Sequence, residues 1–131
     1  MTVEGNKRIA RAFFAKLGTD DISTLATFLS DDIAWWTNGA RLIPGSPIKR
    51  GSEVIEAFAQ IPKLFPRGLV VTPTGLTAEK DRVAVEAVSY GVTANGRIYE
   101  NTYHFALTIR EGRIVSGREY MDTLYLKETL F

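Results

Sequence analysis

Residues 112–123 read GRIVSGREYMDT, and their pattern is the strongest structural signal in the chain. The opening glycine marks a tight turn, and the alternation that follows indicates a β-strand. Successive side chains of a strand point to opposite faces, so Gly117, Glu119 and Met121 share one face. Asp122 precedes an amphipathic tail and is predicted to cap a closing helix. Glu119 is unusual, because it shares an apolar face with Met121. Burying a carboxylate there costs free energy unless it has hydrogen-bond partners or a functional role.

The composition is that of an ordinary globular domain. With 131 residues, 45% of them hydrophobic and 24% charged, one domain spanning 1–131 can bury a core. The net charge of +1 argues against nucleic acid or an anionic membrane as a partner. No apolar run approaches the roughly 20 residues of a membrane-spanning helix. The first residues lack the pattern of a signal peptide, so we expect a cytoplasmic protein.

The types of side chain limit the chemistry. The sequence has no cysteine, which excludes disulfides, thiolate zinc sites and cysteine nucleophiles. The single histidine, His104, argues against a serine–histidine triad or a multi-histidine metal site. Catalysis would therefore depend on carboxylates, tyrosines, tryptophans and water, and we expect no cofactor and no metal.

Hydrophobic periodicity divides the chain into a helical part and a sheet part. Helices are predicted over 3–17, from 20 or 21 to 29, and from 51 to about 61, with an aromatic strand over 33–38 and a loop over 39–50. Strands are then predicted over 69–77, 82–92, 97–110 and 113–121. Asn95-Gly96 is a strong hairpin signal, because both residues tolerate positive φ. The last three strands therefore form an antiparallel meander in an α+β domain.

The strand over 97–110 indicates which of its faces is buried. The face predicted to point to the core carries Tyr99, Asn101, Tyr103, Phe105, Leu107 and Ile109. The strand over 82–92 is ambiguous. One possible inward set is Arg82, Ala84, Glu86, Val88 and Tyr90, of which Glu86 and Tyr90 suit a polar pocket. The other is Val83, Val85, Ala87, Ser89 and Gly91, which is more apolar.

The order of these elements resembles the nuclear-transport-factor-2-like fold. The ending GRIVSGREYMD, with DDIAW at 31–35, PG at 44–45, KRG at 49–51 and DRVAVE at 81–86, resembles the SnoaL-like branch of that superfamily. The branch includes polyketide cyclases, limonene epoxide hydrolase and relatives of ketosteroid isomerase. The resemblance is specific for the fold and not for the reaction, because this fold hosts many unrelated chemistries.

The resemblance implies a single SnoaL-like domain over 1–131. Its fold is a cone-shaped, curved antiparallel sheet wrapped around three N-terminal helices, with a short C-terminal helix, which is the cystatin-like α+β barrel. It also implies an internal pocket and a homodimer packed through the outer face of the sheet. The C-terminal helix would either cover the pocket or contact the second subunit.

The resemblance also allows a comparison residue by residue. Limonene epoxide hydrolase activates water with an Asp-Arg-Asp relay, completed by a Tyr and an Asn. Glu119 falls at the last Asp, while the Arg and the first Asp fall near Glu86 and Val88. The Tyr and the Asn fall near Trp35 and Thr37. This register favours the inward set of Glu86, Val88 and Tyr90, and we predict that orientation.

We therefore predict a pocket with two carboxylates. Its predicted catalytic residues are Glu119, Glu86 and Tyr103, and its predicted substrate-binding residues are Trp35, Thr37, Tyr90, Asn101 and Met121. Two glutamates brought close together raise at least one pKa, so a protonated and an ionised glutamate form an acid–base couple. Tyr103 and Asn101 would donate hydrogen bonds to a substrate oxygen.

Two functions fit this pattern. The first is a cofactor-independent acid–base enzyme of the isomerase, cyclase or epoxide-hydrolase type, acting on a hydrophobic small molecule. The second is a non-catalytic domain that binds a small ligand or a protein partner, with Glu119 bonded to Asn101 or Tyr103 in a structural network. Convergence of Glu86 and Glu119 on an open, ligand-sized cavity favours the enzyme, whereas a cavity filled by aromatic side chains favours the second function.

Overall fold

The predicted helices form close to their expected bounds. The computed structural model describes residues 2–39, 42 and 46–131. The helices are α1 (Val3–Lys16), α2 (Ile22–Thr27), α3 (Ser52–Ala59), α4 (Ile61–Leu64) and α5 (Thr123–Leu130). Asp122 caps α5 as predicted, because its carboxylate accepts a hydrogen bond from the backbone N–H of Tyr125 at 3.1 Å. Among the described residues, no helix is long and apolar enough to cross a membrane.

The strands make one curved sheet in the order β2-β1-β7-β6-β4-β3, with β5 pairing β4. The strands are β1 (Leu29–Thr37), β2 (Ile48–Arg50), β3 (Leu69–Glu79), β4 (Arg82–Val92), β5 (Ile98–Tyr99), β6 (Thr102–Arg110) and β7 (Arg113–Met121). Strands β4, β6 and β7 form the predicted antiparallel meander. The sheet is mixed rather than wholly antiparallel, because β1 runs parallel to β7.

Several predicted segments differ from the structure. Strand β1 begins at Leu29 rather than at residue 33, and α4 is a fourth N-terminal helix where three were predicted. The predicted loop over 39–50 contains β2, which pairs antiparallel with β1. Residues 40–41 and 43–45 of that loop, including Pro44 and Gly45, lie outside the described residues. The single strand predicted over 97–110 is divided into β5 and β6 by a break at residues 100–101.

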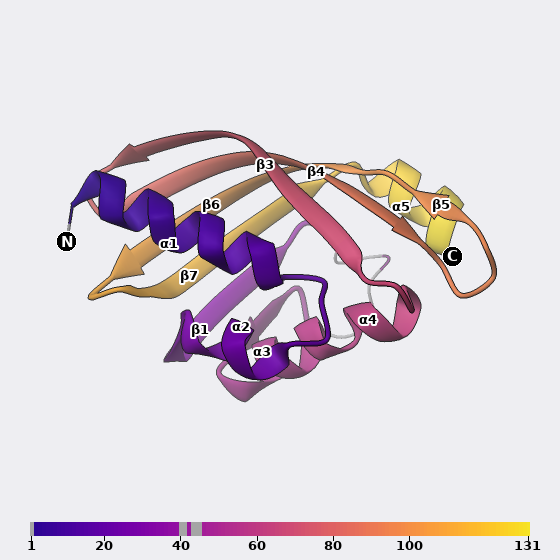
Figure 1. The fold of residues 1–131 in the computed structure, drawn as a ribbon, viewed down its shortest axis with the longest axis horizontal. Coiled ribbons are helices and arrows are strands. Elements are labelled where there is room, and N and C mark those ends of the chain that lie inside the picture. The colour runs from indigo at the N-terminus through magenta and orange to yellow at the C-terminus, as the bar shows by residue number, and fades with distance from the viewer. Residues whose placement is uncertain (1, 40–41, 43–45) are drawn as a thin grey trace.

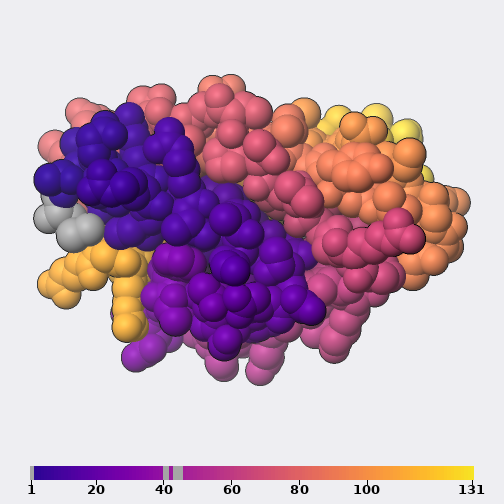
Figure 2. Space-filling view, viewed as in Figure 1, coloured from indigo at the N-terminus to yellow at the C-terminus, as the bar shows by residue number. Residues whose placement is uncertain are grey.

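The helices cover the concave face of the sheet. Figure 1 shows the long strands curling over α1. Helices α2, α3 and α4 lie on the same side of the sheet as α1, and α5 lies at the C-terminal end of the chain. In the space-filling view, α1 and α2 cover the middle of this face (Figure 2). The arrangement is the predicted α+β cone, in which the helices and the inner face of the sheet enclose the apolar core.

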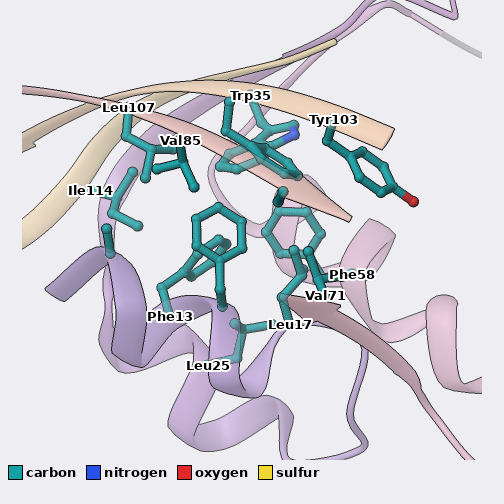
Figure 3. Close-up of a cluster of buried hydrophobic side chains, with 14 of the residues drawn as sticks. Phe13, Leu17, Leu25, Trp35, Phe58, Val71, Val85, Tyr103, Leu107 and Ile114 are labelled. Atoms are coloured by element: carbon teal, nitrogen blue, oxygen red, sulfur yellow. The ribbon is translucent and has the colours of Figure 1, made fainter. Parts of the chain in front are cut away.

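The core contains apolar side chains from both layers. Phe13 of α1, Phe58 of α3 and Phe105 of β6 pack around Trp35, with ring centroids 5.1 to 6.1 Å from that of Trp35. Figure 3 shows this cluster, with Tyr103 at its edge and its hydroxyl pointing away from the apolar side chains. The face predicted from the strand over 97–110 is confirmed, since Tyr99, Asn101, Tyr103, Phe105, Leu107 and Ile109 are all buried.

The predicted orientation of β4 is wrong. Val83, Val85 and Ala87 are buried, whereas Glu86 and Tyr90 are exposed on the outer face of the sheet. The apolar set faces the core because burying a valine side chain stabilises the fold by about 1.5 kcal/mol or more, whereas burying a carboxylate costs free energy.

Ser89 and Gly91, the polar residue and the glycine of the buried face of β4, each have a place in the core. Ser89 is hydrogen-bonded to the Tyr103 hydroxyl at 2.9 Å. Gly91 leaves room for Phe65 and Leu69, since a Cβ at this position would lie 2.9 Å from a carbon of each. The inward face of β4 is therefore compatible with a close-packed core at both positions.

The outer face of the sheet carries several large apolar side chains. Val70 of β3 and Tyr90 of β4 lie opposite each other and are 60% and 51% exposed. Val88, Ile98 and Tyr120 are also exposed. An apolar area of this kind on a sheet is typical of an interaction surface.

Candidate functional site

The parallel pairing of β1 with β7 brings Trp35 and Glu119 onto one inward face. Trp35 lies opposite Gly117, and Thr37 lies opposite Glu119. The Trp35 ring lies against Gly117, where a Cβ would come within 2.2 Å of two ring carbons. Only a residue without a side chain fits under the ring, so Gly117 lets Trp35 lie along β7 toward Glu119.

A hydrogen bond joins the two side chains. The indole Nε1–H of Trp35 donates to Oε1 of Glu119 at 3.0 Å. Trp35 is itself fixed by the core, since it is 4% exposed and makes an edge contact with Phe58 at 5.1 Å between ring centroids. The donor is therefore held in place before any ligand arrives, which is the preorganisation that electrostatic catalysis needs.

The surroundings of Glu119 favour its protonated form. Desolvation by burial raises the pKa of Glu119 to about 7, and the hydrogen bond from Trp35 opposes this rise by stabilising the carboxylate. At neutral pH both the acid and the base form are then populated. A group in this condition can both accept and donate a proton.

Glu119 lines a cavity of about 480 Å³. Its walls are mainly apolar and come from β1, β2, β7, α3, α4 and α5, with Phe58, Ile61, Leu126 and Leu130 among the lining residues. The volume lies within the range of small-molecule sites. The C-terminal helix α5 thus forms part of the wall of the cavity.

Four predicted site residues lie together in this cavity: Trp35, Thr37, Glu119 and Met121. Lys49 and Gln60 also line it and were missed. Lys49 belongs to β2, in the segment predicted to be a loop, and its place opposite Trp35 follows from the pairing of β1 with β2. The sequence signal for Lys49 was its position in the KRG segment that resembles the family. That resemblance does not indicate which way the side chain points.

Asn101 and Tyr103 do not line this cavity and are held in a separate buried network. The Tyr103 hydroxyl is hydrogen-bonded to Ser89, and the Asn101 side-chain amide donates to the Tyr99 hydroxyl at 2.7 Å and to the carbonyl of Asp122 at 3.2 Å. Burial raises the pKa of Tyr103 far above its ordinary value, so it stays neutral. These groups already have partners within the protein.

Glu86 and Tyr90 lie outside the site. Both point from β4 to the outer face, and Gly75 of β3 and His104 of β6 lie opposite Glu86. The predicted pair of glutamates therefore does not form. Among the described residues that line the cavity, the ionisable side chains are Glu119 and Lys49.

Comparison with known proteins identifies the domain type. The model of the SnoaL-like domain family matches residues 10–117. An NTF2-like protein from Burkholderia xenovorans is 27% identical, with a TM-score of 0.78 over 100% of this chain and 99% of that chain. A putative isomerase from Bacillus subtilis is 21% identical, with a TM-score of 0.83 over 98% and 95%. TerC, co-crystallised with polyporic acid, is 21% identical, with a TM-score of 0.81 over 95% and 97%. Among curated proteins, none matches this sequence.

The raised pKa of Glu119 predicts how stability depends on pH. In the unfolded chain the carboxyl titrates near its ordinary 4.5, and in the folded protein at about 7. Between these values the folded state holds a proton that the unfolded state has released, so stability falls as pH rises. The free energy of unfolding should drop by about 3 kcal/mol across this window.

Urea unfolding of wild type and Glu119→Gln between pH 4 and 8 measures this slope. The free energy of unfolding of wild type should fall relative to that of Glu119→Gln as pH rises from 4.5 to 7. Glu86→Gln, which alters an exposed carboxylate, should follow the wild type. Parallel curves for wild type and Glu119→Gln would contradict the assignment.

Proposed function

The chain belongs to the SnoaL-like domain family, and from its cavity we propose that it is a cofactor-independent acid–base enzyme acting on a hydrophobic small molecule. One observation carries the proposal. A single carboxyl group with a pKa near 7 faces an apolar, ligand-sized cavity and holds a fixed hydrogen bond from Trp35. An acid–base group is most effective when its pKa lies near the working pH.

The proposed reaction is a proton transfer at carbon. Ionised Glu119 removes a proton from a C–H bond next to a carbonyl group, and the electron pair moves into the resulting enolate. The same carboxyl then returns the proton at another atom, which gives an isomerase. Alternatively, the enolate attacks a second carbonyl of the substrate, which gives a cyclase, and Glu119 supplies the proton to the new alkoxide.

This scheme favours two of the three reaction types considered. Isomerisation and cyclisation need one group that gains and loses the same proton, as Glu119 can. Opening of an epoxide by water needs a base for the water and an acid for the epoxide oxygen. Glu86 is not available for the second role, because it points to the outer face. We therefore propose the isomerase or cyclase type.

The proposal predicts that the protein catalyses exchange at an acidic C–H bond. We use 2-tetralone, a hydrophobic cyclic ketone, in D₂O and follow the loss of its α-proton signals by NMR. Wild type should accelerate the exchange, with a rate that rises with pH about a midpoint near 7. Glu119→Gln should lower the rate at least about a hundredfold, because general-base catalysis contributes that much.

Glu86→Gln is the matched control and should keep the wild-type rate. The melting temperature of Glu119→Gln should stay unchanged or rise above pH 7, since the substitution removes a charge from an apolar cavity. Equal rates for wild type and Glu119→Gln would contradict the proposed role of Glu119.

A second candidate is a non-catalytic domain that binds a small ligand. The observation in its favour is the buried network, in which Asn101 and Tyr103 are bonded to the protein, so the two donors predicted for a reacting oxygen do not face the cavity. Binding of 2-tetralone by wild type without any exchange would support this candidate over the enzyme.

For the partner, we propose a second copy of the chain on the outer face of the sheet. The exposed pair of Val70 and Tyr90 supports this, as do the cation–π contact of Arg118 with Trp36 at 4.1 Å and the nearby ring of Tyr120. Aromatic and arginine side chains of this kind are enriched in protein interfaces. The face also carries both charge signs, with Glu86 on β4 and Arg118 on β7, which suits contact with an identical face.

The double substitution Val70→Glu and Tyr90→Glu tests this surface. Analytical ultracentrifugation should find wild type as a dimer and the double variant as a folded monomer, because four like charges would face one another in the dimer. Leu124→Glu changes an exposed leucine of α5 and should leave the dimer intact. A monomeric wild type, or a dimeric double variant, would rule out this interface.

A further inference from the structure

A lysine lines the same cavity as Glu119. Lys49 of β2 lies directly opposite Trp35 of β1 in an antiparallel pair, so the two side chains share the inward face. Lys49 is partly buried and contributes to the wall of the cavity. The charged residues of this wall are Lys49 and Glu119, one from each side of β1.

The Lys49 ammonium has no carboxylate partner among the described residues. Their ion pairs join Lys7 to Glu4, Lys16 to Asp21 and Arg110 to Asp81. The polar contact of Lys49 is a long one, in which Nζ donates to the carbonyl oxygen of Ser46 at 3.5 Å. A cation beside apolar walls is partly desolvated, so a bound ligand with a negative charge stabilises it.

A groove with two further cations adjoins the cavity. It has a volume of about 470 Å³ and shares Leu64, Leu130 and Phe131 with the cavity wall. Lys63 of α4 and Arg97 before β5 are exposed along it, and its lining among the described residues includes no Asp or Glu side chain. A concave surface with one sign of charge raises the local concentration of the opposite ion and speeds its approach.

We propose that the molecule bound in this cavity is an amphipathic organic anion, with its acidic group on Lys49 and its apolar body against Trp35 and Phe58. This inference rests on the proposed function and names its substrate class. Lys49 and Glu119 are on strands β2 and β7, which lie on either side of β1 and are therefore about 10 Å apart. The acidic group of the ligand and its reacting carbon are thus held by different residues.

A matched pair of fluorescent probes tests the charge preference. One is 1-anilinonaphthalene-8-sulfonate, and the other is N-phenyl-1-naphthylamine, which has the same rings without the sulfonate. Wild type should bind the anionic probe more tightly, and added salt should weaken that binding. Lys49→Met should weaken binding of the anionic probe about tenfold or more and leave the neutral probe unchanged or tighter.

Two further variants separate charge from folding. Lys49→Arg keeps the charge and should retain the preference for the anionic probe. Lys127→Met removes the same charge from an exposed position on α5 and should bind both probes as wild type does. Circular dichroism and the melting temperature establish that each variant is folded.

The outcomes distinguish this inference from the function on which it rests. Equal loss of both probes in Lys49→Met, or wild type binding both probes equally, would overturn the charge preference and leave the acid–base proposal standing. Failure of wild type to bind either probe, with 2-tetralone exchange also absent, would overturn both.

Discussion

The site depends on one hydrogen bond, from the indole N–H of Trp35 to the carboxylate of Glu119. Three features make it possible. Strand β1 runs parallel to β7, which places Trp35 beside the strand that carries Glu119. Gly117 leaves room for the indole ring. Phe58 and its neighbours fix that ring from the other side. Because the core holds the donor rigidly, the acceptor carboxyl keeps one orientation at the edge of the cavity.

The same geometry sets the charge state of the site. Burial favours the protonated form of Glu119, and the Trp35 hydrogen bond favours the ionised form, so the pKa settles near 7 rather than far above it. One carboxyl balanced in this way takes the place of the pair of glutamates that the sequence predicted. The cation at Lys49 lies across β1 from it, so the group proposed to transfer protons and the group proposed to bind the ligand are on different strands.

The sequence predicted the sheet better than the site. Alternation along the strands placed Glu119 and Met121 inward and identified the buried face around Tyr103, because a strand allows only two orientations. The same rule did not settle β4. Ser89 is accepted in the core through a hydrogen bond to Tyr103, a contact between strands that local pattern does not indicate. Lys49 was missed for a similar reason, since its strand exists only by pairing with β1.

The most direct measurement is the titration of the Glu119 side-chain carboxyl, followed by ¹³C NMR in the wild-type protein and in Trp35→Phe. We expect a midpoint near pH 7 in wild type. The midpoint in Trp35→Phe should be higher, because the variant loses the hydrogen bond that stabilises the carboxylate. A wild-type midpoint near the ordinary 4.5, or no change in the variant, would contradict the proposed role of Trp35 and Glu119.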